Sequence, residues 1–159
     1  MDTQILIGLL LTILPIFELR GGLPVIVEYC VRNQISVWPY FLIVLILNIL
    51  LIFFVFLFLD FLHELLMKNR IYRAVVGRFL NKVHHKSEKI KLKMNDWGYL
   101  ALMFFVAIPL PGTGAWTGAA VAWMMELDRF RSFVAIALGI LIAGLLILFL
   151  SFGLFSGLH

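Results

Sequence analysis

The chain is poor in cysteine and in charged residues. Cys30 is the only cysteine, which excludes an intrachain disulfide and a metal site made of cysteines. Charged residues make up 14% of the sequence and hydrophobic residues 63%, whereas roughly a quarter of the residues in a soluble domain are charged. No linker or low-complexity stretch divides the 159 residues. The composition therefore predicts one domain, residues 1–159, whose surface mostly faces lipid.

The sequence also lacks the motifs of common catalytic sites. It has no H-E-x-x-H zinc motif, no P-loop, no cluster of Cys and His, and no Ser/His pair in register. His84 and His85 have no acidic or Cys partner at ligand spacing, so we interpret them as a solvated pair. We therefore expect no enzyme activity, no cofactor and no metal, and any uphill transport would need an ion gradient or a partner protein.

The positive charge is concentrated in residues 60–96, which hold nine Lys or Arg against four acidic residues. A basic stretch between apolar segments indicates a cytoplasmic face near anionic lipid. Nucleic acid is the weaker interpretation, because no aromatic stacking pattern or base-reading motif accompanies the charge. Apolar residues recur in this segment at helical spacing, which predicts an amphipathic helix on the inner leaflet; they are Leu65, Tyr72, Val76, Phe79 and Val83.

Two apolar runs are long enough to span a membrane, which takes about 20 residues. They cover residues 39–59, interrupted by Asn48, and residues 133–154, interrupted by Ser151. We interpret Asn48 as a hydrogen-bonding residue between helices. Small residues at four-residue spacing predict that the last helix packs closely against another helix; they are Ala135, Gly139 and Ala143.

The other apolar runs are too short to span a membrane and come in pairs. Residues 5–17 and 23–31 are separated by FELRGGLP, and residues 97–110 and 115–125 by PLPGTGAW. Paired short runs with Gly/Pro breaks predict two re-entrant helical hairpins, whose breaks face each other or a cavity because lipid cannot satisfy open backbone. The alternative is that residues 5–31 form one helix, kinked at Gly21–Gly22, and that residues 97–125 form another.

The two halves of the chain repeat the same order of elements. A shift of 94 positions places Pro15 on Pro109 and the first long run on the second. With residues 60–96 in the cytoplasm, the halves enter the membrane from opposite faces and both termini lie outside. The predicted fold is an all-α membrane protein with an inverted repeat, a pattern typical of secondary transporters. Its parts are residues 1–59, the basic connector 60–96, and residues 97–159.

The two breaks contain the candidate site. Glu18 is a candidate proton acceptor, and Arg20 is suited to an anionic head group; the alternative is that they only neutralise each other or pin the hairpins. We expect Gly21 and Gly22 to make the turn and Pro24 to start the next helix. Helix N-termini at Gly22 and Gly114 would then point into the membrane and bind an anion with Arg20. The second break contributes Pro111, Gly112, Thr113, Gly114, Trp116 and Thr117, with Trp116 expected to line a cavity.

The motifs ELRGGLP and PLPGTGAWTGA resemble the paired motifs of the small multidrug export protein family, which is related to the DedA membrane proteins. This resemblance implies a bacterial or archaeal cytoplasmic-membrane protein with two re-entrant hairpins. Some DedA-type proteins are linked to proton-dependent homeostasis and to recycling of polyprenyl-phosphate carriers. DedA proteins usually carry arginines around the second motif, whereas the nearest ones here are Arg129 and Arg131.

The sequence thus predicts a proton-linked transporter that exports a small amphiphilic or anionic substrate. One alternative is a translocase of a phosphorylated lipid carrier such as a polyprenyl phosphate. A second is a membrane scaffold that transports nothing, and a membrane enzyme acting on lipid head groups fits least. The expected partners are membrane lipid, protons, the substrate and further copies of the chain, without nucleic acid.

Overall fold

The computed structural model describes residues 3–66, 97–110 and 112–157, and all of their regular secondary structure is helical. Most of the basic segment 60–96, with its expected amphipathic helix, lies outside the described residues. The all-α prediction is confirmed for the part of the chain that is described. The helices are α1 (Thr3–Ile13), α2 (Glu18–Arg32), α3 (Trp38–Leu66), α5 (Trp97–Ala107), α6 (Ala115–Met124) and α7 (Arg129–Ser156).

The two long helices, α3 and α7, contain the two long apolar runs. They have 29 and 28 residues and are the described helices that are long and apolar enough to cross a membrane. At 1.5 Å per residue each is about 40 Å long, which exceeds the roughly 30 Å of a bilayer's hydrocarbon core. α7 begins four residues before its apolar run, because the Asp128 side chain accepts a hydrogen bond from the backbone N–H of Arg131 and caps the helix.

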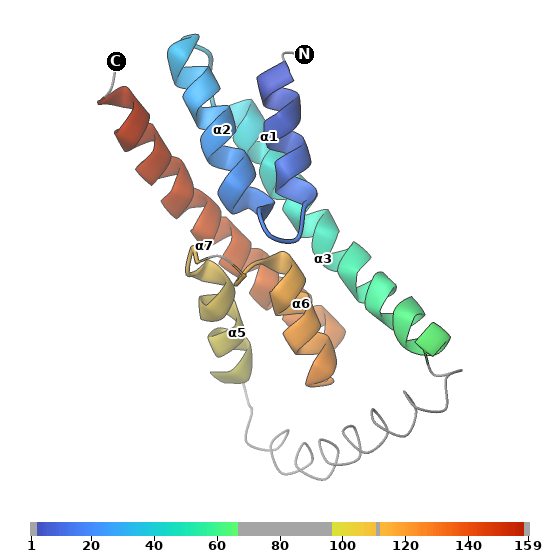
Figure 1. Ribbon diagram of the computed structural model, residues 1–159. Coiled ribbons are helices and arrows are strands. Elements are labelled where there is room, and N and C mark those ends of the chain that lie inside the picture. The colour runs from blue at the N-terminus through green and yellow to red at the C-terminus, as the bar shows by residue number, and fades with distance from the viewer. Residues whose placement is uncertain (1–2, 67–96, 111, 158–159) are drawn as a thin grey trace.

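The four short helices form two pairs. α1 and α2 have 11 and 15 residues, and α5 and α6 have 11 and 10, so each is roughly 15–23 Å long. Figure 1 shows the α1–α2 turn and the α5–α6 connection pointing toward each other in the middle of the molecule. The start of α1 and the end of α7 lie on one side of the molecule, and the end of α3 and the start of α5 lie on the other (Figure 1).

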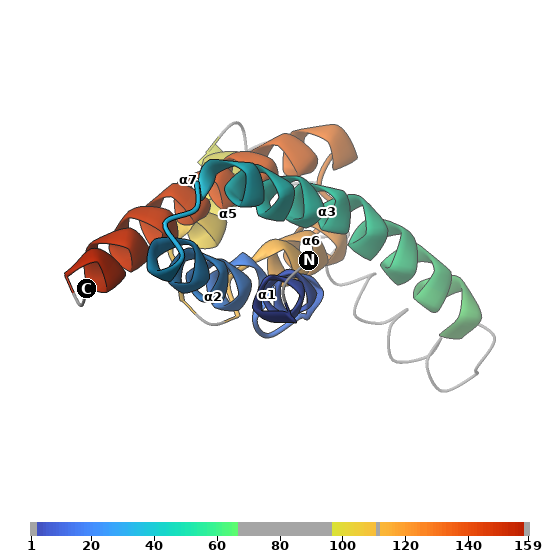
Figure 2. The ribbon, with the colours of Figure 1, turned by 90° about the horizontal axis from the view of Figure 1, so that it is seen from above.

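Helix α2 lies among three other helices. It contacts α1, α3 and α7, and Figure 2 shows it beside α1 in the angle between the two long helices. Large exposed apolar side chains occur on each of the other five described helices, whereas α2 has none. Such a wide exposed apolar surface suits a lipid environment. Cys30 is fully buried in α2, where it packs in the core.

The first break lies earlier in the chain than the sequence predicts. The turn covers residues 14–17, with Pro15 inside it, and α2 begins at Glu18. The backbone N–H of Glu18 donates to the carbonyl of Leu14 at 2.9 Å, and Glu18 itself adopts φ +46. The predictions that Gly21 and Gly22 make the turn and that Pro24 starts the next helix are therefore wrong. A single helix over residues 5–31 kinked at these glycines is also wrong, since α1 and α2 are separate.

The glycines act in packing, and the small stripe on α7 does so as predicted. A Cβ at Gly22 would overlap Oγ1 of Thr12 and the carbonyl oxygen of Gly8, so α1 and α2 touch through their backbones. A Cβ at Gly139 would come within 2.7 Å of the Met103 carbonyl oxygen, which places α7 directly against α5. Short helices with few side-chain contacts gain stability from such close approach.

The close approach at Gly22 predicts the effect of adding one methyl group. Gly22→Ala should lower the stability of the purified protein in detergent by about 1–3 kcal/mol, because the backbone of α1 must move away. Thermal unfolding measures the loss. Gly153→Ala in α7 is the matched control, since its Cβ would meet nothing within 4 Å. A melting temperature for Gly22→Ala at or above that of the control would contradict the close packing.

Candidate functional site

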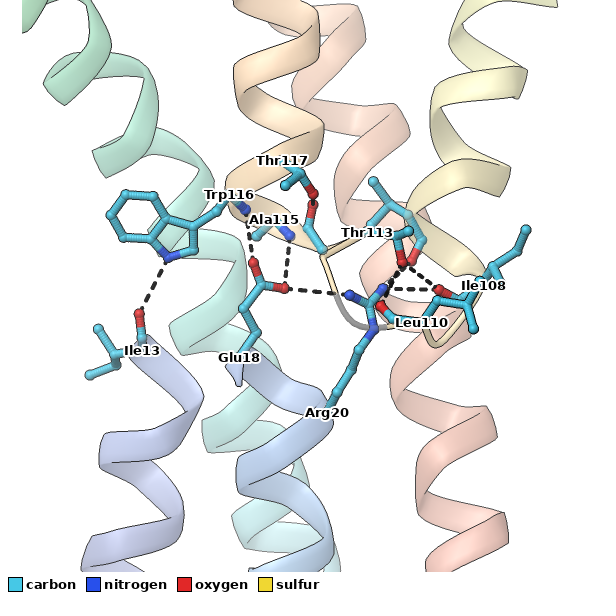
Figure 3. A network of polar contacts seen from close by, with 11 residues as sticks. Ile13, Glu18, Arg20, Ile108, Leu110, Thr113, Ala115, Trp116 and Thr117 are labelled. Atoms are coloured by element: carbon cyan, nitrogen blue, oxygen red, sulfur yellow. Dashed lines mark hydrogen bonds and ion pairs between the residues drawn. The ribbon is translucent and has the colours of Figure 1, made fainter. Parts of the chain in front are cut away.

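The carboxylate of Glu18 binds the N-terminus of α6. Its two oxygens accept hydrogen bonds from the backbone N–H groups of Ala115 and Trp116, each at 3.0 Å (Figure 3). Only 5% of Glu18 is exposed. The first N–H groups of a helix have no partner inside the helix and carry partial positive charge. Glu18, from the first hairpin, therefore caps a helix of the second hairpin.

Arg20 binds the C-terminal end of α5. One guanidinium nitrogen donates to the carbonyl oxygens of Val106 and Ile108, at 2.9 and 3.1 Å. The other terminal nitrogen lies 3.9 Å from the carboxylate of Glu18 (Figure 3). The last carbonyls of a helix lack helical partners and carry partial negative charge, so a cation is stabilised there. Arg20 thus joins the acid of its own helix to the end of α5.

In a third contact, a side chain of the second hairpin binds a helix end of the first. The indole N–H of Trp116, on α6, donates to the carbonyl oxygen of Ile13 at the end of α1, at 3.3 Å (Figure 3). Three helix ends at the centre are therefore capped by side chains of the other hairpin. We call this set of contacts the tip junction, made by the side chains of Glu18, Arg20 and Trp116 with the helix ends they bind.

The backbone conformation of the second break depends on the hydroxyl of Thr113 and on two glycines. The hydroxyl of Thr113 lies 2.7 Å from the carbonyl oxygen of Ile108 and 2.9 Å from that of Leu110. Gly112 has φ +83, a conformation that other residues rarely adopt. A Cβ at Gly114 would occupy the position of the Glu18 carboxylate, so glycine there leaves room for the cap. The hydroxyl of Thr117 donates to the Gly114 carbonyl at 3.3 Å.

The tip junction contains some of the predicted site residues and not others. Glu18, Arg20, Gly114 and Trp116 come together, and Thr113 and Thr117 lie beside them (Figure 3). Gly21, Gly22 and Pro24 lie inside α2, beyond its first turn, because the helix begins at Glu18. Pro111 is outside the described residues.

The expected helix N-terminus at Gly22 is wrong, whereas the one at Gly114 is confirmed, since α6 starts at Ala115 with Gly114 as its N-cap. The anion nearest to that N-terminus is the carboxylate of Glu18. A cavity beside the junction has a volume of about 10 Å³, far below the several hundred Å³ of ligand sites. The junction is therefore closed to a substrate molecule in this conformation.

A second polar cluster, at the end of the molecule where α3 finishes, was missed by the sequence reasoning. Oδ1 of Asp60 accepts hydrogen bonds from the indole N–H of Trp123, at 2.7 Å, and from the guanidinium of Arg129, at 2.6 Å. The Arg129 guanidinium also lies 4.8 Å from the centre of the Phe56 ring. This Asp60 cluster joins α3 to α6 and α7. The sequence signal for this cluster was an acidic residue, Asp60, directly after the apolar run 39–59.

The opposite end of the molecule has a comparable set of contacts. The guanidinium of Arg32 lies 3.4 Å from the Glu28 carboxylate and donates to the side-chain oxygen of Gln4 at 2.6 Å. The amide nitrogen of Gln4 donates to Glu28. This Glu28 cluster ties the start of α1 to the end of α2. Each polar cluster thus lies at an end of the molecule, and the tip junction lies between them.

Comparison with known proteins identifies a family. Residues 18–146 match the model of a family described as "Putative small multi-drug export protein". The chain belongs to this family. The comparisons with curated proteins and with solved structures gave no match. The match begins at Glu18, directly after the first turn, and it includes the second break and the side chains of Glu18, Arg20 and Trp116. The relationship to the DedA proteins stays a prediction.

The geometry of the cap predicts that Glu18→Gln destabilises the protein. An amide has one acceptor oxygen, so one backbone N–H of α6 would face an NH₂ group. We expect a loss of about 1–3 kcal/mol in unfolding free energy, measured by thermal or denaturant unfolding. Gly114→Ala should cause a similar loss by displacing the carboxylate. Glu64→Gln, at an exposed position of α3, is the control. Equal stability of Glu18→Gln and the control would show that the cap is dispensable.

Proposed function

We propose that the chain is a secondary transporter of a prokaryotic cytoplasmic membrane, which exports a small amphiphilic or anionic substrate in exchange for protons. The family description makes a role in export plausible. The observation that carries the proton linkage is a buried acid at the contact between the two hairpin tips. Buried ionisable groups in membrane proteins are typical of substrate and proton pathways.

The proton would act by releasing one hairpin from the other. An ionised Glu18 attracts Arg20 and the N-terminus of α6. Protonation removes the negative charge, so both attractions weaken and one carboxyl oxygen becomes a donor facing backbone N–H groups. The tips can then separate, and the small cavity between them can widen to admit a substrate. In this scheme the described conformation is the closed, unprotonated one.

The arrangement of the helices supports re-entrant hairpins in an inverted repeat. The short helices reach only part of a bilayer's thickness, and their tips meet between the polar clusters at the two ends. The start of α1 and the end of α7 share one side of the molecule (Figure 1). With the basic segment 60–96 in the cytoplasm, that side faces outward.

The topology predicts which sites a membrane-impermeant thiol reagent reaches. In a Cys30→Ala background, cysteines replacing Ile5 and Val31 should both label from outside intact cells, and a cysteine replacing Lys86 should label only after the inner face is opened. Labelling of the first two positions from opposite sides would mean that residues 5–31 cross the membrane. The Lys86 variant serves as the control for cell integrity.

Transport in proteoliposomes tests the proposed function. Vesicles with an internal pH-sensitive dye should report proton movement when a substrate from a panel of amphiphilic cations and anions is added. Glu18→Gln, assayed where it remains folded, should abolish the signal, whereas Glu64→Gln should retain it. Activity with polyprenyl phosphate alone would indicate the lipid translocase. Wild-type protein that moves neither class would indicate a scaffold and would overturn the proposal.

A further inference from the structure

A small cavity joins the tip junction to helix α3. It has a volume of about 10 Å³ and is lined by side chains from four helices. Its polar lining comes from Glu18 and Arg20 of α2 and from Asn48 of α3. The apolar lining contains Leu19, Val106, Ile140 and Ala143. This volume is about the smallest that holds one water molecule.

Two buried polar atoms of these lining residues have no hydrogen-bond partner among the described residues. They are Nε of Arg20, a donor, and Oδ1 of Asn48, an acceptor. Only 1% of Asn48 is exposed. Buried polar atoms of this kind are nearly always satisfied by protein or by an ordered water. The donor and the acceptor belong to residues that line the same cavity.

The backbone carbonyl of Val44 determines the orientation of the Asn48 amide. Nδ2 of Asn48 donates to the backbone carbonyl of Val44, one turn earlier in α3, at 3.1 Å. A carbonyl can only accept, so the opposite orientation would bring two acceptors together. Oδ1 is therefore the atom left for the cavity. The prediction that Asn48 forms a hydrogen bond between helices is wrong for its direct contacts. Among the described residues its hydrogen bond is to the carbonyl of Val44, in the same helix.

We infer that the cavity binds one water molecule, which accepts a hydrogen bond from Nε of Arg20 and donates one to Oδ1 of Asn48. The carboxylate of Glu18 lines the same cavity and provides a third partner, and a buried water typically makes about three hydrogen bonds. A cation is disfavoured by the fixed charge of Arg20. A polyatomic anion exceeds the volume, and Glu18 repels it.

This water makes Asn48 a positioning residue of the tip junction. The terminal nitrogens of Arg20 already contact Glu18, Val106 and Ile108. The water accepts from Nε, a further donor of the guanidinium, and fixes its plane from the side of α3. Helix α3 then connects to both hairpin tips through Arg20. The site does not depend on transport, since it follows from burial and hydrogen bonding alone.

Hydration of Arg20 can be measured directly in lipid bilayers. Solid-state NMR of the reconstituted wild-type protein should show magnetisation transfer from water to the Nε–H of Arg20, assigned by its loss in Arg20→Lys. Asn48→Leu, which keeps a similar volume but removes the acceptor, should abolish this transfer. Ser132→Ala is the matched control, because the Ser132 hydroxyl is also buried without a described partner and does not line the cavity.

Each outcome decides the question. Transfer to Arg20 that is lost in Asn48→Leu and kept in Ser132→Ala supports the site. A wild-type protein without transfer overturns it, as does transfer that persists unchanged in Asn48→Leu. An experimental structure that resolves other buried waters is a second test of the site. It should show density within about 2.7–3.2 Å of both atoms, whereas a direct Arg20–Asn48 hydrogen bond would exclude the water.

Discussion

The structure depends on a carboxylate of one hairpin that binds the backbone end of a helix in the other. A helix that ends in an apolar interior leaves N–H groups without partners, and a charged side chain there costs about 2.5–3.5 kcal/mol on insertion scales. Glu18 and the N-terminus of α6 satisfy each other, as do Arg20 and the last carbonyls of α5. The two interrupted helix pairs are tolerated in this interior because the helix ends of one pair are capped by side chains of the other.

In the proposed mechanism, the same exchange couples the position of the hairpins to the charge on Glu18. Removing one partner of a buried ion pair costs about 3–5 kcal/mol, because the other partner stays buried and uncompensated. The 3.9 Å separation from Arg20 makes this ion pair a long one, so the shorter contacts to Ala115 and Trp116 hold the carboxylate. In the proposed transporter the structural and the functional role of Glu18 would coincide, since the carboxylate that holds the tips together is also the group that a proton would neutralise.

Sequence reasoning predicted which helices are long and which are short, because this follows from the lengths of the apolar runs. It also predicted that the two breaks meet, because open backbone in lipid is costly. It misplaced the first turn, since local glycine and proline signals were weighed above the contacts of Glu18. In the structure Glu18 takes φ +46, a conformation that tertiary contacts support and that no local pattern indicates. The Asp60 cluster was missed for a related reason: its partners, Trp123 and Arg129, are more than 60 residues away.

The polar clusters at the two ends suggest which parts would move. The Glu28 cluster holds α1 to α2 at their far ends, and the hydroxyl of Tyr99 accepts from the backbone of Asp128, which ties the start of α5 to the α6–α7 turn. Backbone contact at Gly22 holds α1 to α2 near the tip. Within each pair of helices these contacts do not involve the carboxylate of Glu18, whereas two of the contacts between the tips are made by it. In the proposed transport scheme, neutralising this acid would weaken the contact between the tips and leave the contacts within each pair of helices in place, as expected of rigid bodies that rock about a fixed site.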